Sequence, residues 1–97
     1  MNWEVRLELE APQTGLDPDV IAAHLAQWFA AHGIADALPQ LTVTDGGDAE
    51  TVGANLTLAA ATPGQALDEA VRLLREAAEG SGVPVGPLAG AEVERVD

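Results

Sequence analysis

The sequence WEVRLELEAPQTGLDPDVIAAHLAQWFAAHG, from Trp3 to Gly33, is the strongest indication of the fold because its hydrophobic period changes once within it. Its first part alternates strictly between apolar and charged residues, which predicts a half-buried strand over Trp3–Glu10. Its second part repeats apolar residues at helical spacing, and Asp17 followed by Pro18 is a strong helix start. Gly33 suits the left-handed cap that ends such a helix.

The predicted helix has one face of large apolar side chains. By helical spacing this face comprises Val20, Ile21, Leu25, Trp28 and Phe29. The helix is expected to run antiparallel to the first strand, so its last turns return to the start of that strand. We therefore expect Trp3 to approach Trp28 or Phe29 in the core.

The middle of the chain predicts a β-hairpin. A short strand is expected over Leu41–Thr44 with Leu41 and Val43 pointing inward, and Asp45–Asp48 has the composition of a turn. The next strand is expected over Thr51–Ala60. Its inward side chains are predicted to be Val52, Ala54, Leu56 and Leu58.

A second helix follows the hairpin. Thr62 and Gln65 have the spacing of a capping box, in which each residue satisfies a free amide of the first turn. On the solvent side Asp68 lies one turn before Arg72, a spacing that favours an ion pair. The expected buried side consists of Leu67, Ala70, Val71, Leu74, Ala77 and Ala78.

The last strand is expected over Ala91–Val96, with a bulge or a frayed end where Val96 falls out of phase. The order strand, helix, strand, strand, helix, strand predicts a single α+β domain over residues 1–97. It is expected to form a two-layer ferredoxin-like sandwich, βαββαβ, with both helices on one face of a four-stranded sheet. Because crossovers are right-handed, strands one and three lie at its centre.

The charge of the chain restricts its partners. Sixteen acidic residues against four arginines and no lysine give a net charge of −12. A nucleic-acid binder needs a basic surface, so nucleic acid is not expected as a partner. No apolar run approaches the ~20 residues that span a membrane, so no membrane contact is expected either. The absence of cysteine fits a cytoplasmic location.

The sequence contains no motif for a cofactor, a metal centre or a catalytic nucleophile. We expect no cofactor or metal and assign no catalytic residue. His24 falls between Val20 and Trp28 on the apolar side of the first helix, which predicts a histidine at the edge of the core. It remains a candidate ligand or interaction residue. His32 lies roughly 80° further round the helix, too far for ordinary chelation with His24.

Four glutamates are the other candidate ligand or interaction residues. Glu4, Glu8, Glu92 and Glu94 are expected to gather on the open face of the sheet, because the first and last strands should be antiparallel neighbours. Such oxygens can hold a hard cation or do acid–base chemistry. Arg6 stands among them and neutralises part of the charge. A solvated acidic face is the favoured interpretation.

The stretches WEVRLELEAP, starting at Trp3, and AVRLLREAA, starting at Ala70, resemble uncharacterised small ferredoxin-like proteins of high-GC actinobacteria. That resemblance implies no activity. RNA-recognition domains share the order of elements, but their outward aromatic residues are replaced here by Glu, Arg, Asn and Thr. Regulatory domains of the ACT type also share it, and their ligand usually lies near the loop that corresponds to Ala11–Asp17.

The function expected first is that of a small acidic accessory or protein-interaction module without catalysis, binding another protein or itself as a homodimer. A small-molecule-binding regulatory domain of the ACT type, with its ligand at a dimer interface, is the alternative. An acidic mimic of nucleic acid has less support. An enzyme of the dimeric α+β barrel kind that uses His24 or His32 also has less support.

Overall fold

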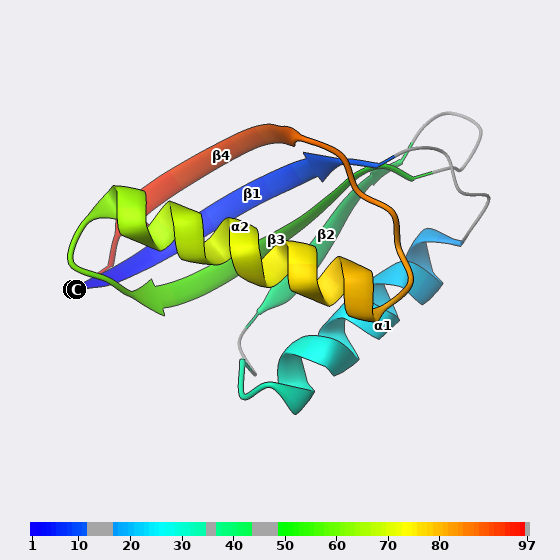
Figure 1. Ribbon diagram of the computed structural model, residues 1–97, viewed down its shortest axis with the longest axis horizontal. Helices are drawn as coiled ribbons and strands as arrows, with labels where there is room; N and C mark the ends of the chain where they lie inside the picture. The colour runs from blue at the N-terminus through cyan, green and yellow to red at the C-terminus, as the bar shows by residue number, and fades with distance from the viewer. Residues whose placement is uncertain (12–16, 35–36, 44–48, 97) are drawn as a thin grey trace.

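The chain folds in the predicted order of strands and helices (Figure 1). The computed structural model describes residues 1–11, 17–34, 37–43 and 49–96. Its elements are β1 (Asn2–Glu10), α1 (Pro18–Ala31), β2 (Leu38–Val43), β3 (Ala49–Ala59), α2 (Pro63–Gly80) and β4 (Leu88–Arg95). The turn expected at Asp45–Asp48 lies outside the described residues.

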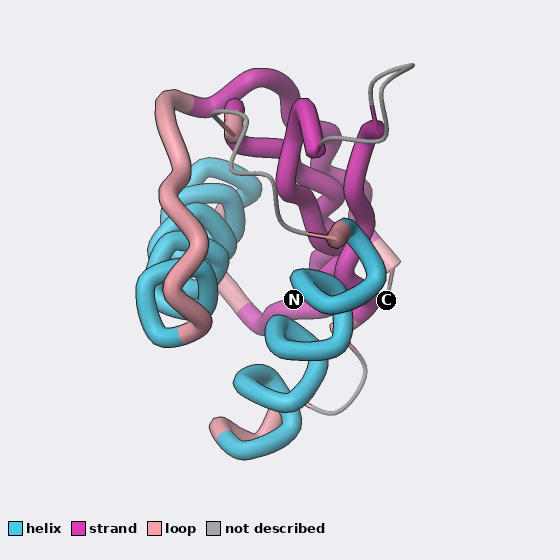
Figure 2. Tube along the Cα trace, turned by 90° about the vertical axis from the view of Figure 1, so that its right-hand side faces the viewer, coloured by secondary structure: helices cyan, strands magenta, loops and turns pink. Residues whose placement is uncertain are grey.

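The sheet confirms the predicted topology. Its four strands are antiparallel neighbours in the order β2-β3-β1-β4, which is the ferredoxin-like arrangement. Both helices cover one face, as Figures 1 and 2 show. Within that layer α1 packs mainly against β2, whereas α2 crosses β1, β3 and β4. The sheet therefore keeps one face without helices.

The core lies between the sheet and the two helices. Alternate residues of β1 and β3 supply one side of it, and the predicted inward positions Val52, Ala54 and Leu56 are buried, whereas Leu58 is half-buried. The largest fully buried side chains are Phe29, Leu7, Leu9, Ile21, Leu25, Leu56, Leu74, Val5 and Val52. The inward orientation predicted for Leu41 and Val43 concerns side chains outside the described part of the chain.

Both edge strands are longer than predicted. β2 begins at Leu38, before the expected Leu41, and accommodates Pro39 because an edge strand can lack an amide donor on its outer side. β4 begins at Leu88 and ends at Arg95. The strand ends one residue before Val96, where a bulge or a frayed end was expected, and the β1–β4 register also shifts at the other end, between Glu8 and Leu9. Beyond the strand, the Val96 amide still donates to the Asn2 carbonyl.

Helix α1 starts and ends as predicted. The Asp17 carboxylate accepts a hydrogen bond from the Asp19 amide at 2.8 Å, with Pro18 in the first turn. Gly33 follows the helix with a φ of 78°, which a residue with a side chain rarely adopts. The Ile34 amide then folds back to the Phe29 carbonyl at 2.8 Å, as in a Schellman motif.

The buried face of α1 is narrower than predicted. Ile21, Leu25 and Phe29 are buried, Trp28 is half-buried, and Val20 is wrong as a core residue because 47% of it is exposed. The buried residues repeat every four positions, so their stripe is centred on Leu25. Val20 lies about 140° from that centre at 3.6 residues per turn.

The predicted meeting of Trp3 with the aromatic residues of α1 is also wrong. The indole Nε1 of Trp3 donates to the carbonyl of Ala60 at 3.0 Å, close to the start of α2. Trp28 packs instead over Gly80 at the other end of α2. The 18 residues of α2 separate these positions by about 27 Å at 1.5 Å per residue.

Helix α2 confirms its predicted cap and most of its predicted face. Thr62 Oγ1 accepts from the Gln65 amide, and Gln65 Oε1 accepts from the Ala61 amide. Leu67 and Val71, expected in the core, are only half-buried. The buried positions are Ala66, Ala70, Leu73, Leu74, Ala77 and Ala78. In the described part of the chain, neither helix is long and apolar enough to cross a membrane.

Candidate interaction surface

The helix-free face of the sheet is polar because β1 alternates. Its outward residues Glu4, Arg6 and Glu8 form the middle of three cross-strand rows. The rows, read from β4 through β1 to β3, are Glu94–Glu4–Thr57, Glu92–Arg6–Asn55 and Gly90–Glu8–Gly53. All four candidate glutamates thus lie on β1 and β4, on the same face.

The four glutamates do not form one cluster. Glu4 lies directly opposite Glu94, but Arg6 lies opposite Glu92. Glu8 lies opposite Gly90, which has no side chain. No group of three metal-ligating side chains occurs among the described residues. The arrangement spreads negative charge along β1 and β4.

Arg6 balances part of this charge within its own strand. Its guanidinium forms an ion pair with Glu4, with Nη2 at 3.1 Å from Oε1, and its Nε also donates to that oxygen at 3.2 Å. The Arg6 side chain is more than half exposed, so this contact stabilises the fold by less than about 1 kcal/mol. One arginine leaves the surrounding carboxylates largely uncompensated.

A shallow hollow lies between β1 and β4 on the same face. It has a volume of about 440 Å³ and is lined by Arg6, Leu7, Glu8, Gly90, Ala91 and Glu92. A Cβ built on Gly90 would meet no atom within 4 Å, so the hollow is the space that a side chain would fill. It opens to solvent beside the edge of the sheet.

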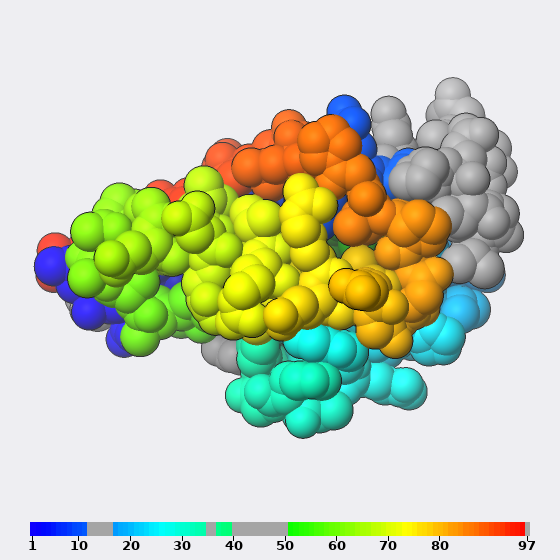
Figure 3. Space-filling view, in the orientation of Figure 1, coloured from blue at the N-terminus to red at the C-terminus, as the bar shows by residue number. Residues whose placement is uncertain are grey.

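β4 is exposed along almost its whole length. Every one of its eight residues is exposed except Val93, which is half-buried. This holds even for Leu88 and Ala91, which pair with the buried residues Leu9 and Leu7 of β1 and therefore share their face. In Figures 1 and 3, β4 follows the upper border of the molecule beyond α2. The helix layer therefore covers the inner side of β4 only in part, although α2 contacts the strand.

The connection before β4 is held firmly. The Gly86 amide donates to the Glu10 carbonyl at 2.6 Å, and the Glu10 amide donates to the Pro87 carbonyl at 2.9 Å. The Arg75 guanidinium of α2 donates to the Gly86 carbonyl at 3.0 Å. These bonds fix the start of β4 against β1 and α2, so its outer edge is presented in a defined position.

His24 does not occupy the predicted place at the edge of the core. It is exposed, because it lies one residue, or about 100°, from Leu25 at the centre of the buried stripe. It borders a second shallow hollow of about 400 Å³ together with Gln27, Trp28, Gly80 and Ser81. An enzyme that uses His24 in a deep pocket between sheet and helices is not supported by this position.

His32 is part of the end of α1. Its ring stacks on Trp28 with centroids 3.8 Å apart, and its Nδ1 lies 2.8 Å from the Trp28 carbonyl oxygen. Trp28 also meets Phe29 edge to face at 5.6 Å. These contacts give His32 a structural role at the helix terminus.

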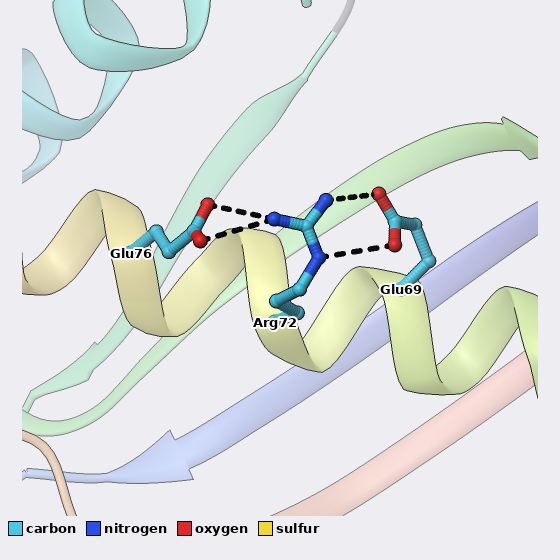
Figure 4. Close-up of polar contacts among 3 residues, drawn as sticks. All are labelled: Glu69, Arg72 and Glu76. Atoms are coloured by element: carbon cyan, nitrogen blue, oxygen red, sulfur yellow. Dashed lines mark hydrogen bonds and ion pairs between the residues drawn. The ribbon is translucent and has the colours of Figure 1, made fainter.

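The outer side of α2 carries a separate polar group. Arg72 lies between Glu69 and Glu76 and forms ion pairs with both, where an ion pair with Asp68 was predicted (Figure 4). Its Nη1 donates to both carboxylate oxygens of Glu76, at 2.9 and 3.0 Å. The hydrogen bonds from Arg72 lower the pKa of Glu69 below its usual value. This satisfied, exposed triad offers no obvious ligand site.

The loop proposed to hold an ACT-type ligand, Ala11–Asp17, falls largely on residues 12–16, which lie outside the described part of the chain. The exposed inner side of β4 was missed by sequence analysis, since the pattern of a strand does not reveal how far a helix layer extends. No protein-family model matches the chain, and no curated protein matches it in sequence. The function is therefore inferred from the geometry of the surface.

Proposed function

We propose that the protein is a small, non-catalytic protein-interaction module of the cytoplasm, and that it engages its partner through the outer edge of β4. One observation carries this proposal. β4 is an edge strand of eight residues, and α2 covers only part of its inner side. An open edge strand presents backbone donors and acceptors to another chain.

Two further features support it. The hydrogen bonds of Gly86 and Pro87 with Glu10 hold the strand in place before any partner arrives, which reduces the entropy lost on binding. The hollows at β1–β4 and at His24 are shallow and open, unlike the concave sites that enclose small ligands. A surface of this kind suits another polypeptide better than a metabolite.

Photo-crosslinking in the cells that naturally express the protein tests the proposal. A benzophenone amino acid is placed at Ala91 on β4 or, as a matched exposed position, at Glu76 on α2. We expect a discrete adduct with another protein from position 91 and none from position 76. Equal labelling at both positions, or no adduct at position 91, would refute the proposed interaction surface.

A further inference from the structure

The pairing of β1 with β4 defines which backbone groups of β4 face outward. The Val96 amide donates to the Asn2 carbonyl, so these two residues form a hydrogen-bonded pair. Pairs alternate along an antiparallel ladder, and the register assigns Glu94 and Glu92 to the bonded positions. The amides and carbonyls of Ala91 and Val93 then point away from β1. Within the described residues, no strand lies beyond β4 to accept them.

The side chains beside this edge differ on its two faces. On the helix-free face are Glu92 and Glu94, with Glu4 and Glu8 one strand further in. On the helix face are the exposed Ala91 and the half-buried Val93, with the exposed Arg95 at the end of the strand. A strand added to this edge would therefore place every second residue beside carboxylates and the residues between them beside small apolar groups.

We propose that β4 binds an extended basic segment of a partner protein, in which Lys or Arg alternates with aliphatic residues. This inference rests on the proposed interaction function. The outward amides and carbonyls of Ala91 and Val93 bond to its backbone. Its cations face Glu92 and Glu94, and its aliphatic residues lie beside Ala91 and Val93. The net charge of −12 draws such a segment toward the surface from a distance.

A second copy of the chain fits this edge less well. Antiparallel pairing of β4 with itself brings Glu92 and Glu94 close to the same carboxylates of the copy. Like charges on facing strands are destabilising. Each copy also carries the full net charge of −12. Self-association through β4 is therefore the competing outcome of the test.

The probe is a capped octapeptide that alternates Arg and Val, compared with a peptide of identical composition whose four Arg precede its four Val. Binding is followed by fluorescence anisotropy at low salt, and amide hydrogen exchange is measured by NMR. We expect the alternating peptide to bind at least tenfold more tightly than the blocked peptide. We also expect it to slow exchange of the Ala91 and Val93 amides at least tenfold.

Two variants separate backbone pairing from charge. Ala91→Pro removes an outward amide without removing a bond to β1, and it should reduce binding to the level of the blocked peptide. Glu92→Gln with Glu94→Gln should weaken binding at least fivefold. The same double change at Glu76 and Glu79 on α2 is the matched control and should alter binding less than twofold.

Equal affinity for the two peptides would overturn the proposal, because charge alone would then explain binding. Unchanged hydrogen exchange at the Ala91 and Val93 amides would overturn it as well. This measurement uses the unaltered protein, so it does not depend on whether a variant folds. If sedimentation shows a dimer that Ala91→Pro dissociates, and the peptide does not bind, β4 pairs with its own copy. A crosslinked partner at position 91 combined with no peptide binding would refute the basic segment and leave the proposed function standing.

Discussion

Gly80→Ala should destabilise the protein because the indole of Trp28 lies where the new methyl group would go. A Cβ at position 80 would be 2.6 Å from Trp28 Nε1 and 2.8 Å from Trp28 Cδ1, well inside van der Waals contact. The ring cannot move freely, since it stacks on His32 and meets Phe29 edge to face. The substitution therefore forces α1 and α2 apart or displaces the indole.

The expected magnitude follows from two opposing effects. Overpacking of this kind costs about 1–3 kcal/mol. Replacing a helical glycine by alanine contributes about 0.5–1 kcal/mol in the other direction. Gly80 has no positive φ, so the backbone accepts alanine without strain. The net loss in free energy of unfolding should be about 1 kcal/mol and at most about 2.5 kcal/mol, and each kcal/mol lowers Tm by about 4–8 °C in a domain of this size.

Gly64→Ala provides the matched control within the same helix. A Cβ there would meet only Thr62 Oγ1, at 4.0 Å, so no clash opposes the gain in helix propensity. This variant should be more stable than the parent by up to about 1 kcal/mol. Urea unfolding at one fixed protein concentration measures both variants, because self-association would otherwise change the apparent stability.

A double-mutant cycle with Trp28→Leu tests the cause. Without the indole, Gly80→Ala should become neutral or stabilising, which gives a coupling free energy of about 1–3 kcal/mol. The reasoning fails if Gly80→Ala melts at or above the parent temperature. It also fails if the cost is the same in the Trp28→Leu background.

Three other predictions concern the core, the surface of α2 and the charge. Phe29→Ala should lower the free energy of unfolding by about 3–5 kcal/mol because its ring is fully buried. Val20→Ala on the exposed side of α1 should change it by less than about 1 kcal/mol. Similar losses in the two variants would contradict the assignment of the buried face of α1. Arg72→Gln should raise the pKa of Glu69 in an NMR titration. Because that pKa is depressed in the folded state, the pair stabilises the protein at pH values above the pKa of Glu69 in the unfolded chain. The stabilisation is lost as the pH falls through the pKa of Glu69 in the folded protein. An unchanged Glu69 pKa in Arg72→Gln would refute the pairing. Mobility-shift assays at low salt, where screening is weakest, should show no saturable binding of DNA or RNA, and clear binding would disprove the repulsion expected from a net charge of −12.

The sequence alone determined the order of elements, the strand topology and the helix caps. These features depend on residues close together in the chain: the alternation of β1, the Asp17 and Thr62 caps, and the glycine at position 33. Connection rules then leave few ways to pair the strands. For the same reason the four candidate glutamates could be placed on one face of β1 and β4 before the structure was known.

How the two layers lie on one another follows from packing in the folded protein. The lateral position of each helix comes from packing between elements distant in sequence, and the period of a single helix does not contain it. Packing brings Trp28 over Gly80 and leaves Trp3 bonded to Ala60, far from the aromatic residues of α1. It also leaves the exposed Val20 and His24 outside the core. The proposed binding edge is open because β4 is the last strand of the sheet, and α2 covers only part of its inner side, an extent that the alternation of a strand cannot encode.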